Sequence, residues 1–218
     1  MTVIAQDRPT VLPANPALVR AIERRISASL FSSSRTVSDA EIHELVRLAT
    51  RAPTAFNLQN WRFIAVRSAE AKARLRALAW DQPKITEAPV TFIIVGAQPR
   101  TKAIAERVRP SIEAGFMPAH MAQGWTDFAD AFYAQHPQVA RDEAIRSATL
   151  GAATLMFAAE ALGLASGPMS GFDPEGVAEA FGLADDERAV LLVAVGHAAP
   201  GNWPQKPRRP VADVLSHA

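Results

Sequence analysis

The chain has 218 residues, of which 49% are hydrophobic and 21% are charged, and its formal net charge is +1. This balance is typical of one soluble globular domain and argues against a dedicated nucleic-acid-binding domain, which would be markedly basic, but it leaves room for a small local anion site. Cysteine is absent, which excludes disulfides, thiolate metal ligands and a cysteine nucleophile.

The sequence predicts a cytoplasmic protein that does not cross a membrane. The N-terminus has no charged start followed by a long apolar run, so no signal peptide is expected. The most apolar segments, 89–97 and 189–195, are far shorter than the ~20 residues that a membrane helix needs. Residues 1–14 are expected to form an N-terminal tail, and residues 15–218 a single domain.

The first third of the chain is predicted to contain three helices and one strand. Asn15 followed by Pro16 is typical of a helix start, and apolar residues at helical spacing continue to about Ile26. Residues 38–41, Ser-Asp-Ala-Glu, form a capping box that opens a second helix, which ends before Pro53. A strand over 62–67 and a third helix over 69–80 follow.

The middle of the chain combines one buried strand with three helices. Residues 89–96 are almost continuously apolar, which indicates a strand covered on both faces. A helix is expected over 99–114, and the next one, over 118–135, has an aromatic face. The helix over 139–162 is apolar nearly all round in its second half, which predicts a position at the centre of a subunit or of a dimer.

The last part of the chain is predicted to add two strands and one helix. A short strand leads into a glycine-rich loop that ends at Asp173, and Asp173 with Pro174 begins a helix. Residues 189–196 are a further core strand, and a helical turn starts at Val211. Because helices far outnumber strands, the chain is expected to adopt an α+β fold, with a small central mixed sheet flanked by helices.

The connector between the second helix and the first strand is a candidate binding surface. It carries Pro53 and Thr54, then Asn57 and Gln59, whose carboxamides offer donors and acceptors to the edge of a planar ligand. Alternatively, Asn57 caps a turn and Trp61 fills the core. The connector alone does not decide between these interpretations.

Common catalytic signatures are missing from the chain. It contains no P-loop, no G-x-G-x-x-G after a strand, no H-E-x-x-H and no G-x-S-x-G. The five histidines show no metal-ligand spacing, so no metal site is expected. An enzyme made from this chain would therefore need an organic cofactor.

Two separated segments carry groups suited to a phosphate. Arg25, Ser27 and Ser29 follow the first helix and offer a guanidinium and two hydroxyls. Lys206, Arg208 and Arg209, near the other end of the chain, could close on the same anion. The simpler alternatives are a solvated helix face for Arg25 and a charged tail for the C-terminal cluster.

Four segments in this order resemble the FMN-dependent nitroreductase family, and the resemblance extends from residue 22 to residue 215. The second and third segments carry the specific part of it. The segments are RISASLF (25–31), APTAFNLQNW (52–61), GPMSGFD (167–173) and KPR (206–208).

The resemblance implies an interlocked homodimer with two FMN sites at the subunit interface. Arg25, Ser27, Lys206 and Arg208 would hold the phosphate, with Ser29 beside them. Asn57 would reach the polar edge of the flavin from the partner subunit, together with its neighbours Pro53, Thr54 and Gln59. The loop of Pro168, Met169, Ser170 and Gly171 would approach flavin N5, with Ser170 and Gly171 nearest.

The implied activity is a ping-pong transfer of hydride from NADH or NADPH, through flavin N5, to a small-molecule electron acceptor. That acceptor would be a nitroaromatic, a quinone, an enone or a small aldehyde. Met117, His120, Trp125 and Phe128 could line the acceptor pocket, although the spacing of Trp125 and Phe128 is already explained by helix packing.

Three positions depart from the family pattern. Ser29 replaces a second basic residue, Asn60 replaces a proline, and Ser170 stands where many members carry glutamate. The segment around Ser170 is similar to the branch that reduces malonic semialdehyde. Because Ser29 removes one cation, a flavin-binding or carrier protein without efficient turnover is an alternative. A third possibility is an α+β dimer that binds no flavin.

Overall fold

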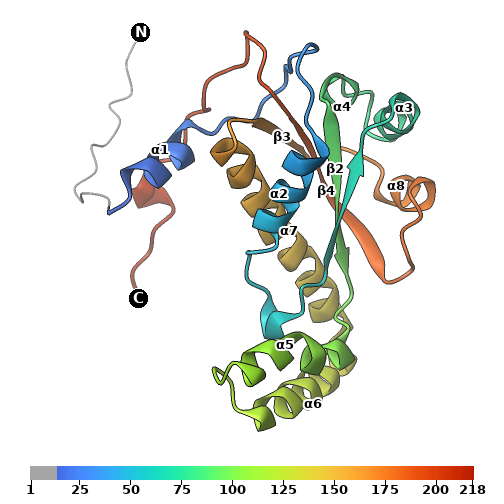
Figure 1. Cartoon of the computed structure of the whole chain (residues 1–218), viewed down its shortest axis with the longest axis vertical. Coiled ribbons are helices and arrows are strands. Elements are labelled where there is room, and N and C mark those ends of the chain that lie inside the picture. The colour runs from blue at the N-terminus through green and yellow to red at the C-terminus, as the bar shows by residue number, and fades with distance from the viewer. Residues whose placement is uncertain (1–13) are drawn as a thin grey trace.

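The computed structural model describes residues 14–218 (Figure 1). The predicted N-terminal tail lies outside these residues except for Ala14. The strands are β1 (Trp61–Val66), β2 (Val90–Ala97), β3 (Ala165–Met169) and β4 (Glu187–Gly196). The helices are α1 (Pro16–Arg24), α2 (Asp39–Ala49), α3 (Ala69–Ala77), α4 (Lys84–Glu87), α5 (Ile104–Glu113), α6 (Ala119–Gln135), α7 (Pro137–Ala161) and α8 (Pro174–Ala180), with short 3-10 turns η1 (Ala55–Asn57), η2 (Thr101–Ala103) and η3 (Val211–Asp213).

The strands form one small sheet in the order β1-β2-β4-β3. Helices together with this small sheet confirm the predicted α+β class. The prediction of a mixed sheet is corrected, because all three strand pairs are antiparallel. In the described residues, parallel pairing is restricted to an isolated bridge between Ser27 and Ser166. The prediction that β2 is covered on both faces is confirmed, because seven of its eight residues are buried.

Helices cover both faces of the sheet (Figure 1). The core on one face joins Phe92 and Ile94 of β2 to α2 and α7. The core on the other face joins Ile93 and Val95 to α3, α4 and α8. A Cβ added to Gly96 would lie 2.3 Å from the backbone oxygen of Ala144, so glycine at this position lets α7 lie directly against the sheet.

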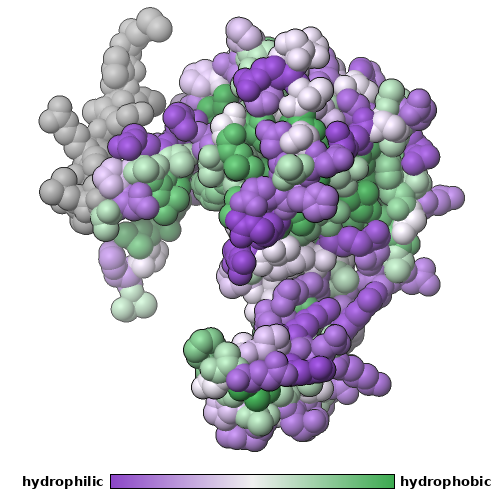
Figure 2. All heavy atoms as spheres, viewed as in Figure 1, coloured by the Kyte–Doolittle hydropathy of each residue, from purple (hydrophilic) through white to green (hydrophobic). Residues whose placement is uncertain are grey.

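Helices α5 and α6 pack on each other and form a lobe at one end of the molecule (Figures 1 and 2). Leu58, from the loop before β1, is buried in this lobe with residues of α5, α6 and the first turn of α7. The aromatic face predicted for α6 is confirmed, since Trp125 and Phe132 pack into this cluster. Phe128 remains 60% exposed.

Most predicted helix starts are confirmed and several helix ends shift. The capping box at Ser38 and Glu41 is present, and Asp173 caps α8 through the backbone N–H groups of Glu175 and Gly176. Helix α1 ends at Arg24 rather than Ile26, because Arg25 already has an extended ψ of 127°. The four-residue α4 was not predicted, since it is too short to show a period.

Candidate cofactor site

The two predicted phosphate segments meet at one cavity. It has a volume of about 340 Å³ and combines hydroxyls from the start of the chain with cations from its end. Its lining residues are Ser27, Ser29, Leu30, Gly201, Asn202, Trp203, Pro204, Gln205, Lys206 and Arg208. The contact between these segments, about 180 residues apart, was expected from their shared suitability for a phosphate and from the family resemblance.

Strand β3 holds the first of these segments in place. The backbone N–H of Ala28 donates to Ser166 O at 2.9 Å. Gly167 lies directly against Ala28, because a Cβ at Gly167 would be 2.2 Å from the Ala28 oxygen. The glycine therefore sets how closely Ser27 and Ser29 approach the sheet.

Asn202 fixes the same segment from the other side. Its Oδ1 accepts from the backbone N–H groups of Ser29, at 2.7 Å, and Leu30, at 3.0 Å. Its Nδ2 donates to the oxygens of Leu30 and Ala199. Sequence reasoning missed Asn202, and its position just before the basic segment was the signal that could have pointed to it.

Gln205 is a second missed positioning residue. Its Nε2 donates to Arg25 O at 2.9 Å, and its Oε1 accepts from Nη2 of Arg208 at 2.9 Å. One carboxamide thus joins the backbone of the first segment to a cation of the second. Arg25 itself does not line the cavity, and its Nη1 donates to Ile26 O at 3.2 Å.

Lys84, from α4, adds a cation that sequence reasoning did not select. Its side chain passes Gly167, and burial together with the positive charge of Lys206 lowers the pKa of Lys84. Within residues 14–218, no carboxylate forms an ion pair with Lys84, Lys206 or Arg208. Uncompensated cations beside two hydroxyls fit an anionic phosphate cofactor such as FMN.

The glycine-rich loop after β3 is only partly available for binding. Met169 is 4% exposed and its side chain packs in the core, and the role of this residue in cofactor binding stays a prediction. Ser170 is exposed and Pro168 is half-buried.

The Trp80 ring, rather than open space, lies next to Gly171. A Cβ at Gly171 would lie 2.5 Å from this ring. Packing against Trp80 therefore explains the glycine at this position without a bound cofactor. Trp80 and Asp81 have φ angles of 51° and 55°, which is strained backbone of the kind found at functional sites. Gln82 ties this bend to the loop, because its Nε2 donates to Gly171 O at 2.8 Å.

The Asn57 connector is a tight turn with several strained residues. Phe56, Asn57 and Gln59 have φ angles of 50°, 52° and 43°. The Asn57 and Gln59 side chains are exposed, and Nε2 of Gln59 donates to Oδ1 of Asn57 at 3.1 Å. Nδ2 of Asn57 donates to Arg107 O at 3.2 Å, which leaves one N–H and one acceptor position of this carboxamide for a ligand.

Pro53 and Thr54 support the same turn. Pro53 is exposed, and Oγ1 of Thr54 accepts from the Gln59 backbone N–H at 3.0 Å. Trp61 packs against Phe63, with ring centroids 6.5 Å apart, and lies 3.4 Å from the Cβ position of Gly151. The interpretation of Trp61 as a packing residue is therefore the better one.

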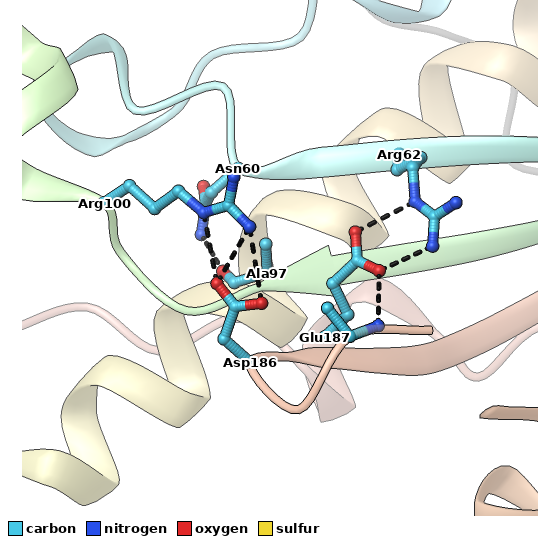
Figure 3. Close-up of polar contacts among 7 residues, drawn as sticks. Asn60, Arg62, Ala97, Arg100, Asp186 and Glu187 are labelled. Carbon is cyan, nitrogen blue, oxygen red and sulfur yellow. Dashed lines mark hydrogen bonds and ion pairs between the residues drawn. The ribbon is translucent and has the colours of Figure 1, made fainter. Parts of the chain in front are cut away.

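Asn60, at the position where the resemblance led us to expect proline, takes part in a group of polar contacts at this end of the sheet (Figure 3). It is 4% exposed, and its Nδ2 donates to Ala97 O at 2.8 Å, while its Oδ1 has no partner. Next to it, Arg100 pairs with Asp186 at 3.0 Å and Arg62 pairs with Glu187 at 2.5 Å. The departure from proline thus replaces a rigid residue with a hydrogen-bonded one.

One chain does not bring the connector to the phosphate cavity. Leu58 packs beside Val139 and Ala140, at the first turn of α7, whereas Gly167 and Ala28 lie at β3, which follows the end of α7 along the chain and packs on this helix. A helix of 25 residues is roughly 37 Å long. Figure 1 shows the same separation, with η1 beside the α5–α6 lobe and β3 at the other end of α7.

The described part of the chain offers neither a metal centre nor a membrane helix. Residues 14–218 contain no group of three or more histidine, aspartate or glutamate side chains that could hold a metal ion. None of the helices in this range is both long enough and apolar enough to cross a bilayer.

Comparison with known proteins agrees with this geometry. The model of the nitroreductase family matches residues 22–197. YodC of Bacillus subtilis, named as an NAD(P)H nitroreductase, is 31% identical over 81% of this chain and 87% of its own length. A Burkholderia lata protein, named as an NADH dehydrogenase/NAD(P)H nitroreductase, is 36% identical over 85% of this chain and 92% of its own.

Solved structures give the same result for the fold. The nitroreductase ydfN of Bacillus subtilis superposes with a TM-score of 0.85 at 27% identity, over 92% of this chain and 98% of that one. A nitroreductase of Exiguobacterium sibiricum, crystallised in complex with FMN, superposes with a TM-score of 0.84 at 25% identity, over 95% of this chain and 100% of that one. The protein therefore belongs to the nitroreductase family.

Proposed function

We propose that this chain is an FMN-dependent oxidoreductase that passes hydride from NADH or NADPH to a small organic acceptor by a ping-pong mechanism. The observation that carries the proposal is the cavity where Ser27, Ser29, Lys206 and Arg208 converge, with Lys84 beside it. Relatives named as NAD(P)H nitroreductases and a related structure that contains FMN support the same cofactor and donor.

The protein would hold the cofactor by its phosphate. Lys206 and Arg208 supply charge, and the hydroxyls of Ser27 and Ser29 supply shorter hydrogen bonds. FMN, when bound, supplies the hydride chemistry, so the protein contributes binding, orientation and exclusion of water. The positive charge of Lys84 would stabilise the negative charge of the bound cofactor. Ser170 and Gly171 would lie beside flavin N5, the atom through which hydride passes.

A second copy of the chain would complete the site. Asn57 is far from the cavity within one chain and retains one donor and one acceptor, as the edge of a flavin requires. A homodimer in which the partner subunit supplies Asn57 satisfies both observations. We propose this assembly with two equivalent sites.

The direct test is reconstitution followed by turnover. Purified protein should bind added FMN, and the loaded protein should reduce a panel of nitroaromatics, quinones, enones and small aldehydes under anaerobic conditions with NADH or NADPH. Malonic semialdehyde belongs in the panel because of the segment around Ser170. Protein that binds no FMN would contradict the proposal.

A flavin-binding protein without efficient turnover is the second candidate. Two features of Ser29 favour it, because both weaken the hold on a phosphate. Its side chain carries no positive charge, and its backbone N–H already donates to Oδ1 of Asn202. FMN binding without reduction of any acceptor in the panel would favour this candidate.

Asn57 is expected to matter more for FMN binding than Gln59. Asn57→Ala removes the carboxamide that would face the flavin and should raise the Kd for FMN on the order of tenfold. Gln59→Ala removes a group that orients Oδ1 of Asn57 and should have a smaller effect. Fluorescence titration of both variants measures the difference, and equal Kd values would contradict the assignment of Asn57.

FMN binding should weaken in alkaline solution because of Lys84. In the free protein, burial and Lys206 lower the pKa of Lys84, and a bound anion would favour its protonated form. Affinity is therefore highest below this pKa and falls as the pH rises through it. The Kd for FMN, measured from neutral pH to about pH 10, should increase, and Lys84→Met should remove most of the increase.

Lys102→Met is the matched control, since Lys102 is an exposed lysine of η2. This variant should keep the wild-type pH profile. A Lys84→Met variant that also keeps it would contradict the role of Lys84.

A further inference from the structure

The strained Asn57 connector is held by the α5–α6 lobe in addition to its own internal hydrogen bonds. Three of the four residues 56–59 have left-handed backbone, at a cost on the order of 1 kcal/mol each. Such strain persists only where neighbouring structure fixes it. The ring of Phe56 contacts Trp125 and Phe128 of α6, with centroids 5.8 and 6.1 Å apart.

Arg107 of α5 makes the polar part of this hold, and it does so twice. Its guanidinium Nη1 donates to Leu58 O, while its own backbone oxygen accepts from Nδ2 of Asn57 at 3.2 Å. The two bonds lie on either side of the peptide that joins Asn57 to Leu58. The bond to Leu58 O depends on the arginine side chain, whereas the bond from Asn57 is to a backbone oxygen and remains when the side chain is changed.

The guanidinium of Arg107 is used for the bond to Leu58 O. Within residues 14–218 it forms no ion pair with a carboxylate, and its side chain is half-buried. Burial, together with the positive charge of Arg100, lowers the pKa of Arg107, yet an arginine remains protonated in neutral solution. Arg100 itself is paired with Asp186 where the central strands β2 and β4 meet their connecting loops (Figure 3).

We infer that Arg107 is a positioning residue for flavin binding: its guanidinium holds the Leu58 carbonyl and thereby the turn that carries the Asn57 carboxamide, which links the α5–α6 lobe to the cofactor. The inference rests on the proposed function, because it needs Asn57 to meet a flavin. Arg107 acts at the ring of the flavin and not at its phosphate. Its loss should therefore weaken FMN and riboflavin by the same factor.

The test is the Kd for FMN and for riboflavin in Arg107→Met, with Arg109→Met as the matched control. Arg109 is exposed, lies on the same helix and makes no side-chain hydrogen bond in the described residues. Arg107→Met should raise both Kd values on the order of tenfold, and Arg109→Met should leave them unchanged. Unchanged affinity in Arg107→Met would overturn the inference.

A double-mutant cycle separates positioning from general damage to the fold. If Arg107 acts through Asn57, the double variant Asn57→Ala/Arg107→Met should bind flavin about as well as the weaker single variant. Independent, multiplied losses would overturn the inference. Should Arg107→Met fail to fold, Arg107→Lys keeps one donor and should show an intermediate Kd, with an unchanged Kd again overturning the inference.

The same titration distinguishes the two levels of the proposal. Wild-type protein that binds neither flavin would contradict the proposed function. Wild-type protein that binds both, with Arg107→Met indistinguishable from it, would contradict only the role of Arg107.

Discussion

Gly167→Ala should lower both the thermal stability of the protein and its affinity for FMN. The new Cβ would lie 2.2 Å from the backbone oxygen of Ala28. The Cβ is fixed by the backbone of residue 167 and the oxygen by that of Ala28, so no side-chain rotation can separate the two atoms. Relief requires the segment from Arg25 to Ser29 to move off β3. Overpacking of this kind costs on the order of 2–3 kcal/mol.

The loss of stability should appear in calorimetry as a drop in Tm of roughly 5–10 °C. Titration with FMN should show a higher Kd, because the displaced segment no longer places Ser27 and Ser29 at the cavity. Gly124→Ala is the control. Gly124 is inside α6 with nothing within 4 Å of its Cβ position, and alanine there should stabilise the helix by about 0.5–1 kcal/mol. A Gly167→Ala variant with wild-type Tm and FMN affinity would show that this contact does not set the site.

The double variant Lys206→Met/Arg208→Met should discriminate between FMN and riboflavin. Both cations line the phosphate cavity, and riboflavin lacks the phosphate. Each charge-assisted hydrogen bond that is lost should weaken FMN on the order of tenfold, so the double variant should lose about a hundredfold. Riboflavin affinity should stay close to that of the wild type.

Arg209→Met is the control for the charge of the C-terminal segment. Arg209 neighbours Arg208 but pairs with Asp213 at 3.9 Å and does not line the cavity. Its removal should change neither Kd by much. Equal losses of FMN and riboflavin in the double variant would place the phosphate elsewhere, and Arg25→Ala is the next variant to examine in that case.

The parts of the fold that depend on local pattern were predictable from the sequence. The capping box at Ser38, the apolar run of β2 and the small residues of α7 each indicate one structure. The mixed sheet was wrong because strand direction depends on which strands pair, and widely separated strands do not encode their partners locally. The site segments were found by their resemblance to a family in order along the chain.

The missed residues all act through contacts between distant segments. Lys84 lies on a helix of four residues, and nothing in its neighbourhood indicates that it faces Lys206. Asn202 and Arg107 matter because of backbone atoms that they bind in other elements. Met169 is a different case: its side chain packs into the core, and the predicted place of its segment near the cofactor stays a prediction.

The central claim is that this chain binds FMN and reduces it with a nicotinamide donor. Anaerobic stopped-flow mixing of the FMN-loaded protein with NADH, and separately with NADPH, tests that claim most directly. The visible absorbance of the oxidised flavin should be lost with at least one donor and should return when an acceptor is added. A flavin that stays oxidised with both donors would contradict the claim.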